Sequence, residues 1–185
     1  MRYGVVLIGA LLATAVVAGC GGKAPLSEDT GTSSAQFQRQ GFDITFRYPA
    51  ALKEADDLIF GSTAGNSDSA RAGVGINKAN VILVSRYDLR RPVTADNVAA
   101  VQAEVDGVIK SLAGKPVRGR RVGFGGLPGY AYTVPLGSPS GAVSRLFVLF
   151  DKQVEYFFNC QSTPETRAEL DGACNQALKT LQHTA

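Results

Sequence analysis

Cysteine and histidine are the side chains most often used as metal ligands, nucleophiles and general bases, and both are scarce in this sequence. The 185 residues include three cysteines, one histidine and no tryptophan. A Cys/His zinc site takes four ligands, so one built mainly from these residues is disfavoured. A catalytic triad would have to use His183 as its base, and we expect that residue to lie in a frayed chain end. The sequence therefore predicts no metal site and no catalytic residues.

Cys20 directly follows an apolar run at the start of the chain. Arg2 supplies a positive charge, residues 5–17 are almost wholly apolar, and Val17-Ala18-Gly19 puts small residues before the cysteine. This arrangement is typical of an export signal, and Val-Ala-Gly-Cys resembles the lipobox of bacterial lipoproteins. The resemblance implies that residues 1–19 are removed and that Cys20 carries diacylglycerol and an acyl lipid such as palmitate. An ordinary cleaved signal and an uncleaved anchor are the alternatives, although an anchor needs about 20 apolar residues.

Residues 20–36 separate the lipid site from the predicted folded part. They are mostly small, polar or charged, with Leu26 as the only large apolar side chain. Such a composition is typical of a flexible tether. We therefore expect a single α+β domain over residues 37–185, held by lipid to the outer face of the bacterial cell membrane.

Export gives the other two cysteines a structural role. Cys160 ends an apolar run, and Cys174 lies on the apolar face of a predicted helix together with Leu170 and Leu178. An even number of cysteines in an oxidising compartment favours a disulfide, which would join this helix to the preceding strand. Closing a loop of about 15 residues is worth about 3 kcal/mol. Two buried free thiols are the alternative, and a redox-active pair is disfavoured because the Cys-x-x-Cys spacing is missing.

Arg118, Arg120 and Arg121 form a basic group in a predicted strand. They could meet anionic lipid headgroups, an attraction of about 1 kcal/mol per charge near the surface. Side chains alternate along a strand, so Arg118 and Arg120 should share one face and Arg121 the other. The alternative, which we favour, is a solvated strand edge whose charges limit aggregation. The formal net charge of +3 is too small to indicate a nucleic-acid partner.

Three further features have plain structural explanations. The glycine-rich residues 119–129 lie between two predicted strands, which favours a turn over a phosphate-binding loop. Asp56, Asp57 and Asp68 lack the carboxylate spacing of a calcium loop. The aromatic residues of the C-terminal half are expected in the core, with a small apolar pocket or a partner surface between sheet and helix as the alternative. They are Tyr130, Tyr132, Phe147, Phe150, Tyr156, Phe157 and Phe158.

The hydrophobic pattern predicts strands, a helix, four strands and a final helix. The first helix should follow an N-cap at Thr94, end at Gly114 and bury Val98, Val101, Val105, Val108, Ile109 and Leu112. The second should open at Thr163-Pro164 and run to about Gln182. Strands are expected at residues 42–47, 58–63, 73–76, 81–87, 117–124, 130–136, 143–150 and 154–160, with 36–39 pairing with the first.

The loops and the periodicity together indicate a fold class. Most neighbouring strands are joined by loops too short for a parallel crossover, so the sheet should be mainly antiparallel. Residues 81–84 are continuously apolar, which places that strand centrally with both faces covered. We therefore expect an α+β fold with about six or seven strands covered by two amphipathic helices.

Two short motifs carry a family resemblance. Phe42-x-Ile44-x-Phe46-x-Tyr48-Pro49 opens the domain, and Gly126-Leu127-Pro128-Gly129-Tyr130 enters a strand before an aromatic hairpin and a terminal helix. This order resembles Mog1/PsbP-like domains, and is most similar to exported actinobacterial lipoproteins of that fold. Leu52 stands near where the family often has an aromatic residue. The resemblance covers residues 37–181 and implies an α/β/α sandwich that binds or assembles without catalysing.

The resulting hypothesis is a monomeric, membrane-anchored lipoprotein of the cell envelope that binds a protein partner or assists assembly. No cofactor is expected beyond the covalent lipid on Cys20. The alternative is a carrier of a lipid or another small apolar ligand, held in a pocket between sheet and helix. A hydrolase is disfavoured because no residue constellation supports one. An apolar cavity that opens to solvent would favour the carrier, and a solid core with an exposed patch would favour the partner module.

Overall fold

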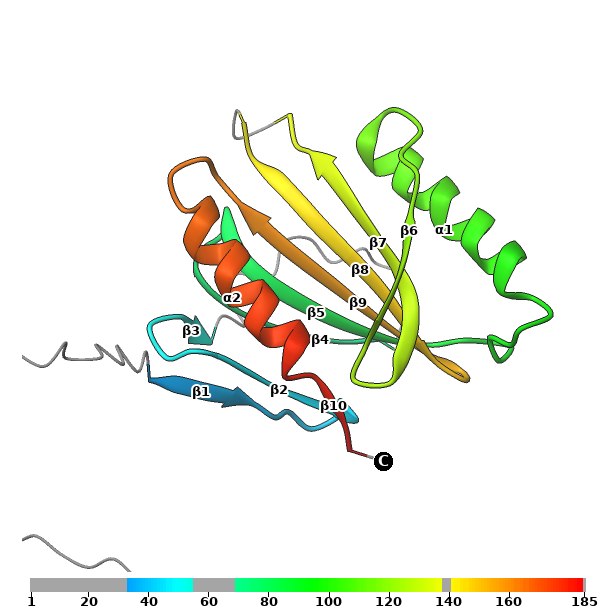
Figure 1. The fold of residues 1–185 in the computed structure, drawn as a ribbon, viewed down its shortest axis with the longest axis horizontal. Helices are drawn as coiled ribbons and strands as arrows, with labels where there is room; N and C mark the ends of the chain where they lie inside the picture. Colours follow the sequence, from blue (N-terminus) through cyan, green and yellow to red (C-terminus); the bar gives the residue numbers. More distant parts are fainter. Residues whose placement is uncertain (1–32, 55–68, 138–140, 185) are drawn as a thin grey trace, which may run out of the picture. The chain divides into compact units, whose positions relative to one another are not determined.

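The computed structural model describes residues 33–54, 69–137 and 141–184 (Figure 1). Several sequence-based expectations lie outside these residues and are therefore not located by the structure. They concern the signal at residues 1–19, Cys20 and most of the tether, the strand at 58–63, and Asp56, Asp57 and Asp68.

Seven antiparallel strands form the main sheet, in the order β3-β4-β5-β9-β8-β7-β6. Its long strands come from the apolar runs of the sequence, and two-residue turns join β4 to β5, β6 to β7 and β8 to β9 as antiparallel neighbours. β5 lies inside the sheet, as its continuous apolar run predicts, and buries Val81, Ile82 and Val84. The expected cover on both faces is incomplete, because Leu83 is only partly buried. The strands are β3 (Lys53–Glu54), β4 (Ser69–Asn77), β5 (Asn80–Asp88), β6 (Arg120–Phe124), β7 (Leu127–Pro135), β8 (Val143–Asp151) and β9 (Val154–Ser162).

A second sheet of three strands contains both ends of the described fold. β1 (Ser34–Phe37) and β10 (Gln182–His183) each pair antiparallel with β2 (Ile44–Pro49). β1 therefore begins at Ser34, inside the stretch expected to be tether. β1 and β2 bury Phe37 and Phe46, whose rings stack with their centroids 4.4 Å apart.

The end of the chain differs from the sequence-based expectation. The last helix stops at Lys179, because Thr180 turns the chain while its Oγ1 accepts a hydrogen bond from the backbone N–H of Arg47 at 2.8 Å. The following residues then pair with β2, and His183 Nε2 lies 3.1 Å from Asp151 Oδ2. The expectations that the helix reaches Gln182 and that His183 lies in a frayed end are therefore wrong.

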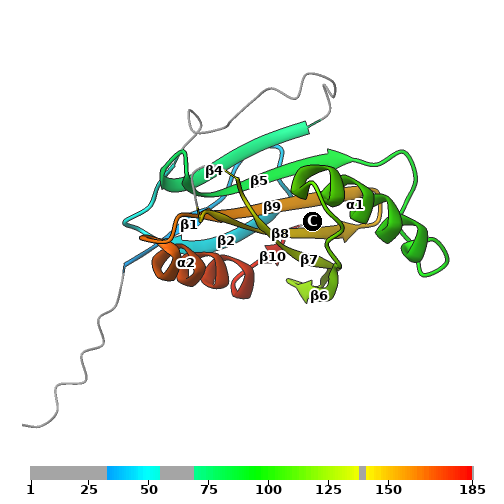
Figure 2. The same cartoon turned by 90° about the horizontal axis from the view of Figure 1, so that it is seen from above.

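Helix α2 (Arg167–Lys179) packs on one face of the main sheet and against β2 (Figures 1 and 2). Its periodicity puts Leu170, Cys174, Ala177 and Leu178 in the core, where they meet side chains from both sheets. This is the larger of the two hydrophobic clusters of the described residues, and it joins α2, the small sheet and one face of the main sheet into a single core.

Helix α1 (Val98–Ala113) lies on the other face and contacts β7 (Figure 2). Asn97, not Thr94, is its N-cap residue, and the Asn97 side chain instead accepts a hydrogen bond from the Thr94 N–H at 2.8 Å. The predicted buried face is also wrong in part. Ile109 is buried, but Val108 is 60% exposed and Leu112 is 62% exposed.

The expected fold class is confirmed: two helices accompany a mainly antiparallel sheet of seven strands, with a further sheet of three. One strand starts later than expected, because β6 pairs with β7 only from Arg120 onward and not from Val117. Among the described residues, neither helix has the combination of length and apolar character that crossing a bilayer requires.

Candidate functional site

A cavity of about 490 Å³ lies between α1 and the main sheet. Its walls come from the inner side of α1, from the segment that leads into the helix, and from β8 and β9. Most of the lining is apolar, while Arg90, Arg91, Glu104 and Glu155 supply charge. The apolar part includes Val101, Val105, Ile109, Val148, Phe150 and Phe157.

A second cavity of about 360 Å³ lies on the same face of the sheet. It is lined by side chains of β4, β5, β7, β8 and β9, and by Leu112 near the end of α1. Phe157 lines both cavities, so its ring lies between them. We call the two cavities together the apolar groove.

The groove exists because α1 covers only part of its sheet face. The helix packs over β7, where the hydroxyl of Tyr132 donates a hydrogen bond to Asp106 Oδ1 at 2.7 Å. The pKa of Tyr132 is raised, mainly because the side chain is buried and to a smaller extent because of this hydrogen bond. No described helix covers the remaining strands on this face, and the side chains that α1 leaves uncovered form the groove floor.

Glu155 is the most perturbed carboxylate in the groove. It lies near the start of β9, next to buried Tyr156 and opposite Phe150 of β8. Burial raises its pKa to about 7. Its carboxyl group forms no hydrogen bond or ion pair with any described residue. A carboxylate in this setting favours its neutral form, which suits an apolar surrounding.

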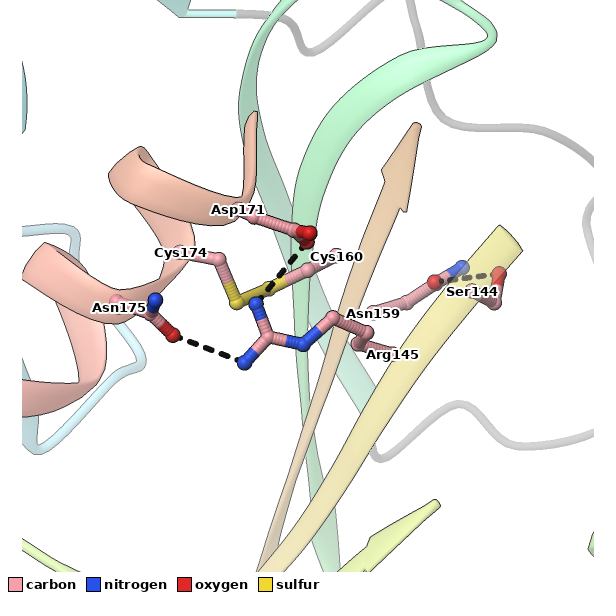
Figure 3. The surroundings of a disulfide bond; sticks show 7 residues. All are labelled: Ser144, Arg145, Asn159, Cys160, Asp171, Cys174 and Asn175. Atoms are coloured by element: carbon pink, nitrogen blue, oxygen red, sulfur yellow. Dashed lines mark hydrogen bonds and ion pairs between the residues drawn. A yellow bond between two sulfur atoms is a disulfide. The ribbon is translucent and has the colours of Figure 1, made fainter. Parts of the chain in front are cut away.

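The opposite face of the sheet carries the disulfide (Figure 3). Cys160 of β9 and Cys174 of α2 are buried and bonded, with their Cα atoms 6.1 Å apart. The structure thus contains the predicted bridge between the last helix and the strand before it. Beside it, the Arg145 guanidinium lies 3.0 Å from Asp171 Oδ1 and donates to Asn175 Oδ1 at 2.8 Å (Figure 3).

The predicted basic group divides as strand alternation requires. Arg118 and Arg120 line a third hollow, of about 280 Å³, together with Arg145 of β8. Arg121 does not line it; this residue is exposed and lies opposite Tyr130, whose side chain belongs to the α1 face. Sequence reasoning missed Arg145, although a charge that alternates with Phe147 and Leu149 on an inward face is a recognisable signal.

The remaining candidates are located by the structure as follows. The glycine-rich residues form the β6–β7 hairpin, in which Gly125 and Gly126 have φ values of 58° and 81°. The expectation of a turn is confirmed. Of the seven aromatic residues singled out by the sequence, all are buried except Phe157, which lines the groove. The described residues contain no group of three side chains suited to hold a metal ion.

Comparison with known proteins identifies the fold. No protein-family model matches the chain, and no curated protein matches it in sequence. The chain is similar in structure to cyanobacterial PsbP (CyanoP) from Synechocystis sp. PCC 6803, with a TM-score of 0.56 and 11% identity over 90% of this chain and 98% of that one. The chain is also similar in structure to a protein from Bacteroides thetaiotaomicron, with a TM-score of 0.53 and 9% identity over 80% of this chain and 47% of that one. At these identities the likeness shows a PsbP-like fold alone.

Proposed function

We propose that this chain is a non-enzymatic binding protein of the bacterial cell envelope, held to the outer face of the membrane by lipid on Cys20. Its folded domain carries a lipid or another small apolar ligand in the apolar groove between α1 and the sheet. The single observation that supports this proposal is the groove itself, whose larger cavity of about 490 Å³ falls in the size range of small-molecule sites.

The shape of the groove favours a small ligand over a flat partner surface. Its floor is a sheet and its wall is a helix, so a bound apolar chain would be surrounded on more than one side. The rim adds Arg90, Arg91 and Glu104, while the interior is largely apolar. A site of this kind binds the apolar body of a ligand inside and leaves a polar end at the rim.

A protein partner is the second candidate, and one observation favours it. Val108 and Leu112 are both more than half exposed and follow one another along α1 at helical spacing. Exposed apolar side chains that adjoin a groove are typical of surfaces that accept a partner segment. In that case the partner would cover the outer edge of α1 and the groove together.

A fluorescent fatty-acid analogue tests the carrier proposal. The described strands of both sheets lie between Ser34 and His183, so a lipid-free chain starting at Ser33 keeps all of these strands. We expect this chain to bind the probe. Phe157→Ala should weaken binding at least about tenfold, because burial of a Phe side chain against ligand is worth about 1.5–3 kcal/mol.

Phe124→Ala is the matched control, since Phe124 is also half-buried but belongs to the α2 face. It should leave probe binding unchanged. If the unsubstituted chain fails to bind the probe, the carrier proposal is wrong and the partner candidate is preferred. Equal weakening by Phe157→Ala and Phe124→Ala would contradict the groove as the site.

A further inference from the structure

The hollow lined by Arg118, Arg120 and Arg145 has a defined structural origin. β7 continues to Pro135, but β6 pairs with it only up to Ala131, so the segment before Arg120 departs from the sheet edge. Gly119 approaches the ring of Tyr132 so closely that a Cβ there would lie 2.5 Å from Cζ. This contact fixes the backbone between the two arginines and places both at one opening.

The charges in the hollow are unbalanced. Within the described residues, neither Arg118 nor Arg120 forms an ion pair or hydrogen bond, and both are exposed. Arg145 is held in place by Asp171 and Asn175, with its guanidinium carbon 5.5 Å from the centre of the Phe147 ring. Asp171 therefore pairs with Arg145 alone, and its carboxylate does not balance the charges of Arg118 and Arg120. Like charges gathered at one opening repel, and an anion between them would relieve that repulsion.

We propose that this hollow binds a phosphate-type oxyanion, with Arg118 and Arg120 as its ligands and Arg145 as a third, fixed positive charge. A guanidinium presents paired N–H donors in a plane that matches two oxygens of a phosphate. The exposed Thr133 also lines the hollow and carries a hydroxyl that can donate to the same group. The site lies on the α2 side of the sheet edge and is separate from the apolar groove, so the inference goes beyond the proposed function.

Two sources could supply this chemistry: free phosphate and the phosphodiester of a lipid headgroup. Isothermal titration of the full chain in non-ionic detergent distinguishes them. One titration uses inorganic phosphate, the other glycerophosphoglycerol, which is a phospholipid headgroup without acyl chains. Sodium chloride at matched ionic strength controls for screening. We expect the unsubstituted chain to bind at least one of the two phosphates.

The variant pair Arg118→Gln/Arg120→Gln should weaken that binding about tenfold or more, because two charge-assisted contacts are lost. Arg121→Gln also removes one positive charge from β6, but the Arg121 side chain lies on the other face of the strand and does not line the hollow. This variant should change binding by less than about twofold. Binding of inorganic phosphate alone supports the site with a free anion as its source. Binding of glycerophosphoglycerol, with or without binding of inorganic phosphate, supports a lipid headgroup.

Three outcomes would overturn the proposal: no binding of either phosphate, an unchanged affinity in the Arg118→Gln/Arg120→Gln chain, or an equal loss in Arg121→Gln. Thermal unfolding without anion checks that the variants fold. If the double variant is unfolded, the single substitution Arg118→Gln decides the matter, because Arg118 is exposed and precedes the strand.

Discussion

Glu155 links the chemistry of the groove to the stability of the fold. Burial raises its pKa to about 7 from the usual 4.5, so between these values the folded protein holds a proton that the unfolded chain releases. Stability should therefore fall as pH rises through this window and level off above it. Glu155→Gln should flatten that part of the profile and make the protein more stable than the unsubstituted chain above pH 7, as measured by urea unfolding at several pH values.

Glu104→Gln is the matched control, because Glu104 lines the same cavity but is exposed. Its pH profile should follow that of the unsubstituted chain. An apolar ligand that covers Glu155 would favour the neutral carboxyl group further, so ligand affinity should also decrease above pH 7. A pH profile that Glu155→Gln leaves unaltered would contradict the assignment of this transition to Glu155.

Of the two helices, α1 contacts the sheet mainly through β7, whereas α2 contacts β2, β5 and β9. The hydrogen bond from the Tyr132 hydroxyl to Asp106 is part of the α1 contact. Removal of this hydrogen bond by Tyr132→Phe should lower the free energy of unfolding by about 1 kcal/mol. Asp106→Ala should cost more, because it leaves the buried Tyr132 hydroxyl unpaired. Urea unfolding measures both effects.

Tyr130→Phe provides the comparison for this pair of variants. Tyr130 is buried on the same strand and face, but its hydroxyl forms no hydrogen bond among the described residues. It should therefore change stability by less than Tyr132→Phe. If the two tyrosine substitutions lower the free energy of unfolding equally, the hydrogen bond between Tyr132 and Asp106 makes no specific contribution to stability.

The disulfide attaches α2 to β9 in the larger core. Reduction of Cys160–Cys174 should lower stability by up to about 3 kcal/mol, because the unfolded chain regains the entropy of a loop of about 15 residues. The loss will be smaller if the reduced helix remains docked through Leu170 and Leu178, which are buried. Thiol titration of the exported, denatured protein should find no free thiol at these positions, and two free thiols would contradict the bridge.

The same elements indicate how far sequence alone could go. Strands such as β8 and β9 were predictable because apolar runs and a tight turn are local signals. β10 was not, since Gln182 and His183 are polar and the helical pattern continues to Leu181. Periodicity identified the apolar side of α1 but not how much of it the sheet could cover, which is why Val108 and Leu112 were misassigned and the groove was only an alternative.

Residues that act between distant elements were also beyond the sequence. The side chain of buried Asn80 accepts a hydrogen bond from the Thr163 N–H at 2.8 Å and another from the Thr166 hydroxyl, and so ties the β4–β5 turn to the start of α2. Nothing local to Asn80 indicates this partner more than 80 residues away. Glu155 was missed for the same reason, because its burial depends on strands and a helix that only the fold brings together. Arg145 has a local signal in its strand, but its partners Asp171 and Asn175 do not.

At the scale of the whole molecule, the two proposed binding sites, the apolar groove and the basic hollow, are separate places on one small domain. The edge strands of the main sheet are short: β3 has two residues, and β6 has five and carries Arg120 and Arg121. Short, charged edges resist pairing with another copy of the chain. A monomer therefore stays the expectation from the sequence, and attachment to the membrane through Cys20 stays a proposal.

The lipid on Cys20 is the feature on which the proposed location depends, and one substitution tests it. Because the cysteine of a lipobox is both the lipidated residue and the marker for cleavage, Cys20→Ser should release the protein from the membrane fraction or leave it as an unprocessed precursor. Fractionation and mass spectrometry of the N-terminus measure the two outcomes. Cys160→Ser/Cys174→Ser, which removes the disulfide and spares Cys20, should stay lipidated and membrane-bound. A mature, lipid-free chain that begins at a residue other than Cys20 would contradict the lipoprotein proposal and require another route to the envelope.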